Sequence, residues 1–468
     1  MRMVLGLLLA ATVSEEELAK LLKQFTQAYV AVEQNYADPV PPERLFYGGA
    51  IPGLLHSLDP FSAFLDPDQF RSLRDMQSSV QKGFGSVVSI APGRVVVLQT
   101  LPGTPSARAG LGAGDEIVDI NGYRLDRLEL EHLVELLRES RQRPAQLMVR
   151  RPGVATLMTF TLVPAELASP SVSRAFLLRP GIGYIKMESF DDATPDEFDR
   201  ALEKLDAAKL RGLVLDLRDN PGGVLPAALD VAATFLRPGQ LILTVRGRSG
   251  PPEEIKVPAD AKPLDMPMAV LVNGKSASAS EIVAGALQDH KRAAIVGEPT
   301  FGKGLVQRVF DLKESTGLAL TTAYYFTPSG RSIQKRLASL HTPQAEPGKG
   351  GITPDEPVSL EGLTPLRAVL EASSSFLQFA QDYTSKRRNL PAGFEVTPEL
   401  LDEFQQFLSG RQIRPGLSEW SANREWVRVR LKTEIYNLAF GVEKGDEVDA
   451  ERDAQIQRAI RIITAPRP

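Results

Sequence analysis

Residues 268–307, MAVLVNGKSASASEIVAGALQDHKRAAIVGEPTFGKGLVQ, join an apolar run, a cluster of small residues and a helix-like segment. Residues 268–272 have the length and composition of a buried strand, and residues 281–290 place apolar side chains on one side of a helix. Ser278 therefore falls at a strand-to-helix junction. Free backbone N–H groups and the positive end of the helix dipole favour a developing oxyanion at such a junction.

A serine is a poor nucleophile at neutral pH unless a base removes its proton. Lys303 lies between apolar segments and has glycine on either side, so it suits a lysine held neutral by burial and acting as that base. Taken alone, serines that precede a helix more often form a cap than a nucleophile. The chain has four histidines, none in a recognisable nucleophile context: His56, His132, His290 and His341.

The segment 273–307 resembles the catalytic segment of the carboxy-terminal (tail-specific) processing proteases, which are serine proteases with a Ser–Lys dyad. The match is long and ungapped. The resemblance implies that Ser278, the middle serine of the SASASE run, is the nucleophile and that Lys303 is the general base. It also implies that Gln307, four residues after the lysine, steadies that lysine.

A second segment, DLRDNPGG at residues 216–223, follows another buried strand. Asn-Pro and Gly-Gly are strong turn signals, and on their own they predict only a tight loop. The resemblance implies that a glycine N–H of this loop, from Gly222 or Gly223, joins the N–H of Ala279 in an oxyanion hole. Only glycine lets the backbone come this close to a tetrahedral intermediate.

Residues 102–111, PGTPSARAGL, and 114–122, GDEIVDING, resemble the core of a PDZ domain. Such domains add an extended C-terminus as a strand and hold its carboxylate in a nest of backbone N–H groups. Residues 132–137 would form the far wall of the groove. The family usually has glycine at two positions of the nest, so we expect weaker tail binding here. The nest is expected at Gly83, Phe84, Gly85, Ser86, Val87 and Val88, with Ser86 and Val88 as the departures.

The fold class expected is α+β and multidomain: a crotonase-like (ββα-type) protease core, an inserted PDZ-like domain, N-terminal helices and a C-terminal helical domain. The resemblance covers about three quarters of the chain, and the core fold is part of what it implies. The expected boundaries are a candidate signal peptide at 1–13, N-terminal helices at 14–77, the PDZ-like domain at 78–165, the protease core at 166–360 and the helical domain at 361–468.

The composition limits the classes of function. The 468 residues are 43% hydrophobic and carry 54 basic and 58 acidic side chains, a formal charge of −4. With no basic block, nucleic acid is not an expected partner. The absence of cysteine excludes a cysteine nucleophile, disulfides and zinc–thiolate sites. We find no metal or nucleotide motif, so no metal site and no cofactor are expected.

The N-terminus has one positive charge followed by an apolar run at residues 4–11, which is typical of a short signal peptide. The alternatives are an N-terminal helical turn and a gene start placed a few codons off. By resemblance to bacterial enzymes of the cell envelope, we expect a periplasmic or membrane-associated location after export. A capping box at Ser14 and an apolar stripe after it predict an amphipathic helix. We expect this stripe to pack in the core, although in the family such helices often join subunits.

The C-terminal region, residues 361–468, carries no recognised chemistry. Its sequence pattern predicts one helix around 376–383 and another at 423–440. Between them it predicts a helix that begins at 398 with Thr397 as its cap and ends at Gly410. We expect this region to pack on the core or to form an oligomer, with substrate or adaptor binding as the alternative.

The leading interpretation is a serine endopeptidase that cleaves near the C-termini of exported or envelope proteins. Its partners would be protein or peptide substrates with apolar C-termini, an adaptor protein and a second copy in a homo-oligomer. The alternative from another class is a PDZ-bearing, catalytically inactive scaffold that binds protein C-termini. A crotonase-like acyl-group enzyme would not need the peptide-binding module.

Overall fold

The computed structural model describes residues 14–71, 80–248, 250–312, 315–335, 350–359, 362–387 and 389–465. The candidate signal peptide at 1–13 lies outside these residues. The chain forms two compact units. The first comprises Met1–Phe70 with Gln307–Thr321, and the second comprises Arg71–Val306 with Thr322–Pro468.

The first unit is helical at its start. Ser14 caps its first helix as the capping box predicts, because its side chain accepts from the Glu17 N–H at 3.2 Å. The expected packing of the apolar stripe in the core is wrong, because no residue of this helix is buried. Pro52 stands at the start of α3, directly after a π-helical turn, so the helical path is irregular there. The elements are α1 (Glu15–Asn35), α2 (Pro42–Leu45), η2 (Phe46–Ala50), α3 (Ile51–His56) and β1 (Ala63–Leu65), which pairs antiparallel with residues 317–319 of β18 (Gly317–Phe326).

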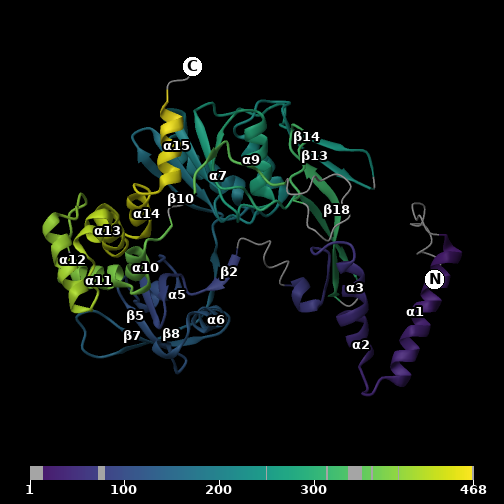
Figure 1. Ribbon diagram of the computed structural model, residues 1–468, viewed down its shortest axis with the longest axis horizontal. Coiled ribbons are helices and arrows are strands. Elements are labelled where there is room, and N and C mark those ends of the chain that lie inside the picture. Colours follow the sequence, from purple (N-terminus) through teal and green to yellow (C-terminus); the bar gives the residue numbers. More distant parts are fainter. Residues whose placement is uncertain are drawn as a thin grey trace. The chain divides into compact units, whose positions relative to one another are not determined.

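Within the second unit, an antiparallel sheet with two α-helices and one 3₁₀ helix forms the PDZ-like domain (Figure 1, blue). Its core is apolar and includes Val95, Val97, Ile120 and Leu147. The strands are β3 (Ser86–Ala91), β4 (Arg94–Thr100), β5 (Glu116–Ile120), β6 (Tyr123–Arg124), β7 (Ala145–Arg150) and β8 (Met158–Leu162), and the helices are α5 (Pro105–Ala109), η3 (Leu125–Arg127) and α6 (Leu130–Ser140). A two-stranded ribbon of β2 (Val80–Gly83) and β9 (Ala165–Ala168) connects this domain to the next.

The core is a six-stranded sheet in the order β10-β11-β12-β15-β16-β19. The first pair is antiparallel and every later pair is parallel. The central strands are buried on both faces, which explains why they are uninterrupted apolar runs in the sequence. The strands are β10 (Val172–Arg179), β11 (Ile182–Met187), β12 (Gly212–Asp216), β15 (Met268–Val272), β16 (Ala294–Gly297) and β19 (Glu356–Pro357).

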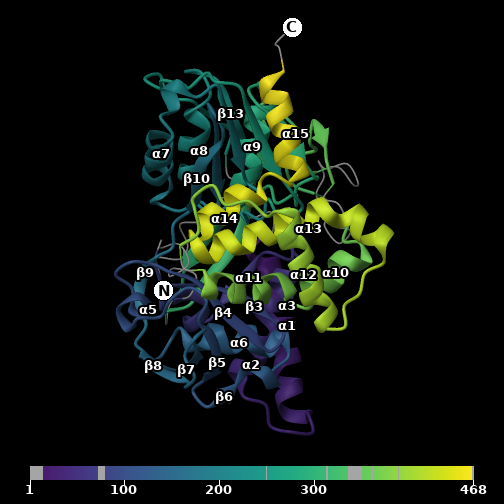
Figure 2. The ribbon, with the colours of Figure 1, turned by 90° about the vertical axis from the view of Figure 1, so that its left-hand side faces the viewer.

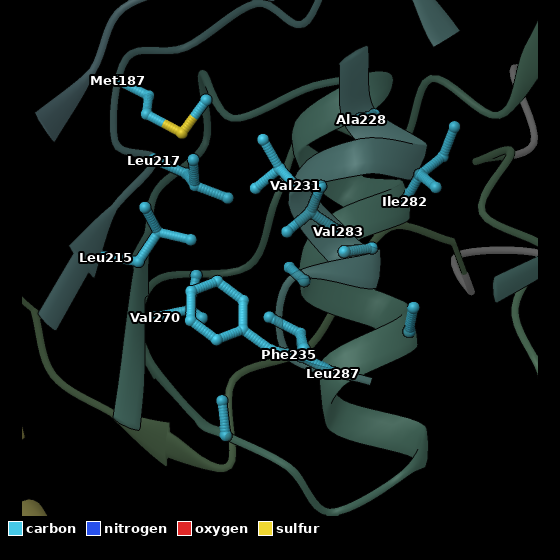
Figure 3. Packing of buried hydrophobic residues seen from close by; sticks show 14 of the residues in the cluster. Met187, Leu215, Leu217, Ala228, Val231, Phe235, Val270, Ile282, Val283 and Leu287 are labelled. Carbon is cyan, nitrogen blue, oxygen red and sulfur yellow. The ribbon is translucent and has the colours of Figure 1, made fainter. Parts of the chain in front are cut away.

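Helices cover both faces of this sheet. On one face, Leu215 and Val270 point toward Val283 and Leu287 of α9 (Figure 3). Against the other face lies the last helix, whose Ile460 packs in a cluster with alternate residues of the same strands (Figures 1 and 2, yellow). The first face carries α7 (Thr194–Lys204), α8 (Leu225–Ala233) and α9 (Ala279–Asp289), near the turn η4 (Ala207–Lys209), and the second carries α15 (Ala454–Thr464).

Several strands lie outside the six-stranded sheet and pair with one another. β13 (Leu241–Gly247) pairs antiparallel with β14 (Glu253–Lys256) and with residues 323–326 of β18. β17 (Leu305–Asp311) also pairs with β18. β17 begins only two residues after Lys303, so strand pairing fixes the chain just beyond the candidate base.

The remaining C-terminal helices have their own hydrophobic core. Thr397 caps the helix that starts at Pro398 and ends at Gly410, as the sequence predicts. The predicted helix at 423–440 begins earlier, at Leu417, and ends at Ala439. The helices are α10 (Pro365–Ala372), α11 (Ser375–Lys386), α12 (Pro398–Gly410), α13 (Leu417–Ala439) and α14 (Val442–Asp449). Across the described part of the chain, no helix combines the length and apolarity needed to cross a membrane.

Candidate active site

Ser278 is the residue immediately before α9, at the end of the turn that leaves β15. Its backbone has φ 55° and ψ −113°, a conformation that is rare for a residue with a side chain. Such strain costs of order 1–3 kcal/mol and persists only where the surroundings impose it. Because Ser278 is partly exposed, the strained turn presents a serine where a substrate can reach it.

The two other serines of the SASASE run have a different role. Ser276 and Ser280 are fully buried. The Ser276 hydroxyl donates to the Leu217 carbonyl at 2.7 Å, and the Ser280 hydroxyl donates to the Asn220 carbonyl at 3.0 Å. These bonds fasten the serine turn to the loop after β12. Of the three serines, the structure therefore leaves the middle one accessible.

A fully buried carboxylate, Glu281, lies under this turn. Its Oε2 accepts from the backbone N–H groups of Ser278 and Lys303, each at 2.8 Å. Its Oε1 accepts from the Gly302 N–H at 2.7 Å and from the Thr300 hydroxyl at 2.5 Å. One side chain thus holds the serine turn and the lysine segment, which are separate in the sequence, on the two oxygens of one carboxylate.

Burial raises the pKa of Glu281, while the hydrogen bonds from Thr300, Lys303, Ser278 and Gly302 act in the opposite direction. The net direction is upward because the group has lost its water. The four donors are the groups that compensate for this lost hydration.

Lys303 is partly buried and lies between two glycines that have little free space. A Cβ on Gly304 would come within 2.4 Å of the Gln334 backbone nitrogen. Gly302 has φ +91°, and a Cβ there would lie 2.6 Å from the Lys335 Cβ. The backbone around the candidate base is therefore tightly enclosed, and side chains at the flanking positions would displace it.

The glycine loop, residues 218–224, passes directly beside Ser278. A Cβ on Gly222 would lie 2.9 Å from the Ser278 Cβ and 2.7 Å from the Ala277 carbonyl oxygen, so only glycine allows this approach. The Gly222 N–H is already used, since it donates to Asn220 Oδ1 at 2.8 Å. Gly223 is exposed, and its N–H has no acceptor among the described residues.

Gln307 belongs to the other compact unit. There its side-chain amide donates to the Phe61 carbonyl at 2.9 Å. Its expected bond to Lys303 stays a prediction. His290 is occupied at both ring nitrogens, with Nε2 2.7 Å from the Leu241 carbonyl and Nδ1 3.0 Å from Gln240 Nε2, which agrees with a structural role.

The segment predicted as the carboxylate nest lies at the start of β3. Gly85 has φ +76° and packs against Thr104, leaving no room for a Cβ. The Ser86 hydroxyl donates to Ser106 Oγ at 2.6 Å, so it is turned toward the protein interior. All the nest residues except Val87 border a cavity of about 290 Å³ that is otherwise mainly apolar. Its lining includes Phe84, Val88, Ile117, Leu137, Leu147 and Leu167.

Sequence reasoning missed three supports of the site: Glu281, Thr300 and Asn220. Glu281 stands three residues after Ser278, and this Ser-x-x-Glu spacing is a capping-box signal that could have indicated the carboxylate's return to the Ser278 N–H. Asn220 is fully buried, and its carbonyl accepts from the Ala277 N–H at 3.0 Å. No sequence signal predicts that contact.

The fold and the site define a peptidase with a PDZ domain, and comparison with known proteins agrees. Residues 181–358 match the model of peptidase family S41, and residues 96–151 match that of the PDZ domain. These two matches cover most of the core sheet and most of the PDZ-like sheet described above.

The particular relatives are carboxy-terminal processing proteases. The enzyme of Bartonella bacilliformis is 37% identical over 69% of this chain and 75% of its own length. The enzyme of Synechocystis sp. is also 37% identical, over 61% of this chain and 68% of its own. A solved structure, the photosystem II D1 C-terminal processing protease, is 29% identical over 75% of this chain and 95% of that chain, with a TM-score of 0.43.

The chain therefore belongs to the carboxy-terminal processing proteases of peptidase family S41. It is a serine-type protease, and with its PDZ domain it acts on protein substrates.

Glu281→Gln tests the buried carboxylate, because it replaces an ionisable group with a neutral one of the same shape. Since burial raises the pKa of Glu281 above its ordinary value of 4.5, the stability this group contributes is complete below pH 4.5 and is lost as the pH rises through the raised pKa. The difference in unfolding midpoint, wild type minus Glu281→Gln, should therefore shrink with rising pH. Thermal unfolding across a pH series measures it.

The matched control is Glu253→Gln, a change at an exposed glutamate on β14. Its difference from the wild type should stay small at every pH. A wild-type advantage at Glu281 that grows with pH would contradict the raised pKa.

Proposed function

We propose that this protein is an endopeptidase that cleaves near the C-termini of exported or envelope proteins, with Ser278 as nucleophile and Lys303 as general base. The observation that carries the proposal is the pair of 2.8 Å bonds from both backbone N–H groups to one oxygen of Glu281. Two residues 25 positions apart are brought together by this carboxylate. A crotonase-like core, with β12 and β15 leading into the glycine loop and the serine turn, is part of the proposal.

The reaction would proceed through an acyl-enzyme. The neutral Lys303 amine removes the proton from Ser278 Oγ, which attacks the scissile carbonyl carbon. The Lys303 ammonium then gives this proton to the leaving amine as the C–N bond breaks. A water molecule, deprotonated by the same lysine, hydrolyses the ester and restores the serine.

The oxyanion that forms in each step needs donors beside Ser278. Of the two glycines considered, Gly223 suits this role better, because it is exposed and its N–H has no acceptor among the described residues, whereas the Gly222 N–H is bonded to Asn220. Ala279 is the first residue of α9, where an N–H has no acceptor within the helix. We assign the oxyanion hole to Gly223 and Ala279, with Gly222 providing the close approach of the loop.

The proposal keeps Gln307 as the residue that steadies Lys303, on the strength of the sequence resemblance. It also assigns the reading of substrate tails to the PDZ domain. The support is the mainly apolar cavity of about 290 Å³ beside Phe84 and Gly85, which has the size and lining for an apolar side chain at a C-terminus. The inward-turned Ser86 hydroxyl does not add a donor for the tail carboxylate.

Two partners belong to the proposal as well. A second copy would join through α1, which buries none of its residues and exposes Leu18, Leu22 and Phe25. Control of the site by an adaptor protein stays a prediction.

We further propose export to the cell envelope, based on the charge and apolar run of residues 1–13. Fractionation of cells that express the full chain should recover the protein in the envelope, and N-terminal sequencing should find it shortened near residue 13. Recovery in the cytoplasmic fraction with Met1 retained would contradict this.

The dyad is tested by Ser278→Ala, Lys303→Ala and Lys303→Arg. Each should abolish cleavage of an unstructured protein with an apolar C-terminus, and the double alanine variant should be no worse than either single one, because the two groups act as a unit. Arginine fails because a guanidinium is not deprotonated in this pH range.

The control is Lys275→Ala, which removes an exposed lysine from the same turn. It should keep wild-type turnover. Substantial turnover by Ser278→Ala or Lys303→Ala would refute the assignment, and an inactive wild type that still binds protein C-termini would favour the scaffold.

Tail reading is tested with matched substrates that carry a free or an amidated apolar C-terminus. Amidation removes the carboxylate charge, so the intact enzyme should cleave the amide more slowly, on the order of several-fold in kcat/KM. A variant lacking residues 81–163 should cleave short peptides and show a smaller difference between the two substrates. Equal rates for both substrates with the intact enzyme would refute tail reading by this domain.

A further inference from the structure

The glycine loop begins at Arg218, whose side chain is only 12% exposed. Its Nε and Nη2 donate to the Asp216 carboxylate, with Nη2 2.5 Å from Oδ2. The remaining nitrogen, Nη1, donates to Asp453 Oδ2 at 2.7 Å and to Gln455 Oε1 at 2.9 Å. One buried guanidinium therefore joins the end of β12 to the first residues of α15, the last helix of the chain.

The charges around this guanidinium are matched. Asp216 is fully buried, which opposes its ionisation, but Arg218, Lys186 and the Tyr184 hydroxyl together lower its pKa. Burial likewise opposes the charge of Arg218, and Asp216 and Asp453 raise its pKa above the ordinary value. Removing one partner from such a buried network leaves an uncompensated charge, which is far more costly than losing a surface ion pair.

Asp453 is itself fixed in place. It caps α15, with Oδ1 accepting from the Gln455 N–H at 2.9 Å and the Ile456 N–H at 3.0 Å. Its side chain is only 15% exposed. The helix behind it is anchored by Ile456 and Ile460 against the core sheet. The packing of the whole helix therefore fixes the position of Asp453 Oδ2, the oxygen that accepts from Arg218.

The chain between Arg218 and the glycines is also restrained, so a shift of Arg218 is passed along it. Lys186 donates to the Arg218 carbonyl, and the Asp219 N–H donates to Asn273 Oδ1 at 3.0 Å. Asp219 has φ 60°, in the left-handed region that Asp adopts more readily than most residues with a side chain. Gly223 follows four residues after Asp219.

We propose that Asp453 is a positioning residue for the peptidase: it holds Arg218, and through Arg218 it sets the glycine loop at the distance from Ser278 that oxyanion binding requires. The inference rests on the proposed function, since it assumes that the Gly223 N–H binds the oxyanion. Asp453 does not touch the substrate. Its effect should fall on the transition state rather than on substrate binding.

Asp453→Asn is the informative substitution. Asparagine is as good a helix cap as aspartate, so its carbonyl oxygen keeps the bonds to the Gln455 and Ile456 N–H groups. Its amide nitrogen then faces Arg218 Nη1, donor against donor, so the charged bond from Asp453 is lost and Nη1 keeps only the neutral Gln455 Oε1 as its acceptor on α15. The control is Arg458→Ala on the same helix, which breaks the 2.7 Å pair with Glu356 and leaves Arg218 untouched.

With the full chain and a protein substrate that has an apolar C-terminus, Asp453→Asn should lower kcat roughly 10- to 100-fold, the scale of a displaced oxyanion donor, and change KM less than about twofold. A peptide boronate, which forms a tetrahedral adduct on serine, should lose affinity by a similar factor. Hydrogen exchange should rise in the glycine loop. Arg458→Ala should keep kcat, boronate affinity and loop exchange near the wild-type values.

The inference is overturned if Asp453→Asn retains wild-type kcat. It is also overturned if Arg458→Ala lowers kcat as much as Asp453→Asn does, because the loss would then come from weaker packing of α15 and not from the bond to Arg218. A parallel Ser278→Ala variant separates this from failure of the proposed function. If Ser278→Ala is inactive while Asp453→Asn is fully active, only the inference fails. If Ser278→Ala keeps turnover, the proposed function fails and the inference fails with it.

Discussion

The site depends on the ionisable side chain of Glu281, buried under the serine turn. A buried carboxylate is costly unless hydrogen-bond donors surround it, and here the donors are the backbone of Ser278, Gly302 and Lys303 and the hydroxyl of Thr300. The donors come from two segments of the chain. If either segment moved away, the buried carboxyl group would lose hydrogen-bond donors that it needs. Because losing these donors would be costly, Glu281 fixes the position of the serine turn relative to the lysine segment.

A second constraint comes from the glycine loop, which lies against the serine turn. Ser278 has a positive φ, and the glycine loop approaches it so closely that Gly222 could not carry a Cβ. The buried hydroxyls of Ser276 and Ser280 bind the carbonyls of Leu217 and Asn220, which hold the two loops together. The strain at Ser278 is therefore balanced by hydrogen bonds two residues before and two residues after it, and of the three serines the middle one alone is partly exposed.

The sequence was sufficient where the information is local. A buried strand, a serine run and an amphipathic segment predict the junction at Ser278, and the cap at Thr397 predicts where α12 begins. It was insufficient where distant segments meet. The spacing of Ile456, Ala459, Ile460 and Ile463 is that of an amphipathic helix and could have predicted α15, but nothing in it indicates that this helix covers the second face of the core sheet. The bond from Arg218 to Asp453, 235 residues away, has no sequence signal at all.

The C-terminal helices link the PDZ-like domain to the core, and the two ends of the link differ in strength. At one end, Gln381 accepts from Arg94 at 2.7 Å and donates to the Gly114 carbonyl at 2.9 Å. The Val442 N–H donates to the Gln99 side chain at 3.2 Å. Bonds of this kind contribute about 1 kcal/mol each, somewhat more where one partner is charged.

At the other end of the same link, Asp453 meets a guanidinium that is almost wholly buried. Breaking a buried pair by removing one partner costs about 3–5 kcal/mol, several times as much as one of those hydrogen bonds. If the PDZ-like domain moves during the proposed binding of a substrate tail, its three bonds to Gln381 and Val442, each weaker than the buried pair, can separate one at a time. The helix bonded to Arg218 would stay in place, and the proposed oxyanion donors would keep their positions while the PDZ-like domain moves.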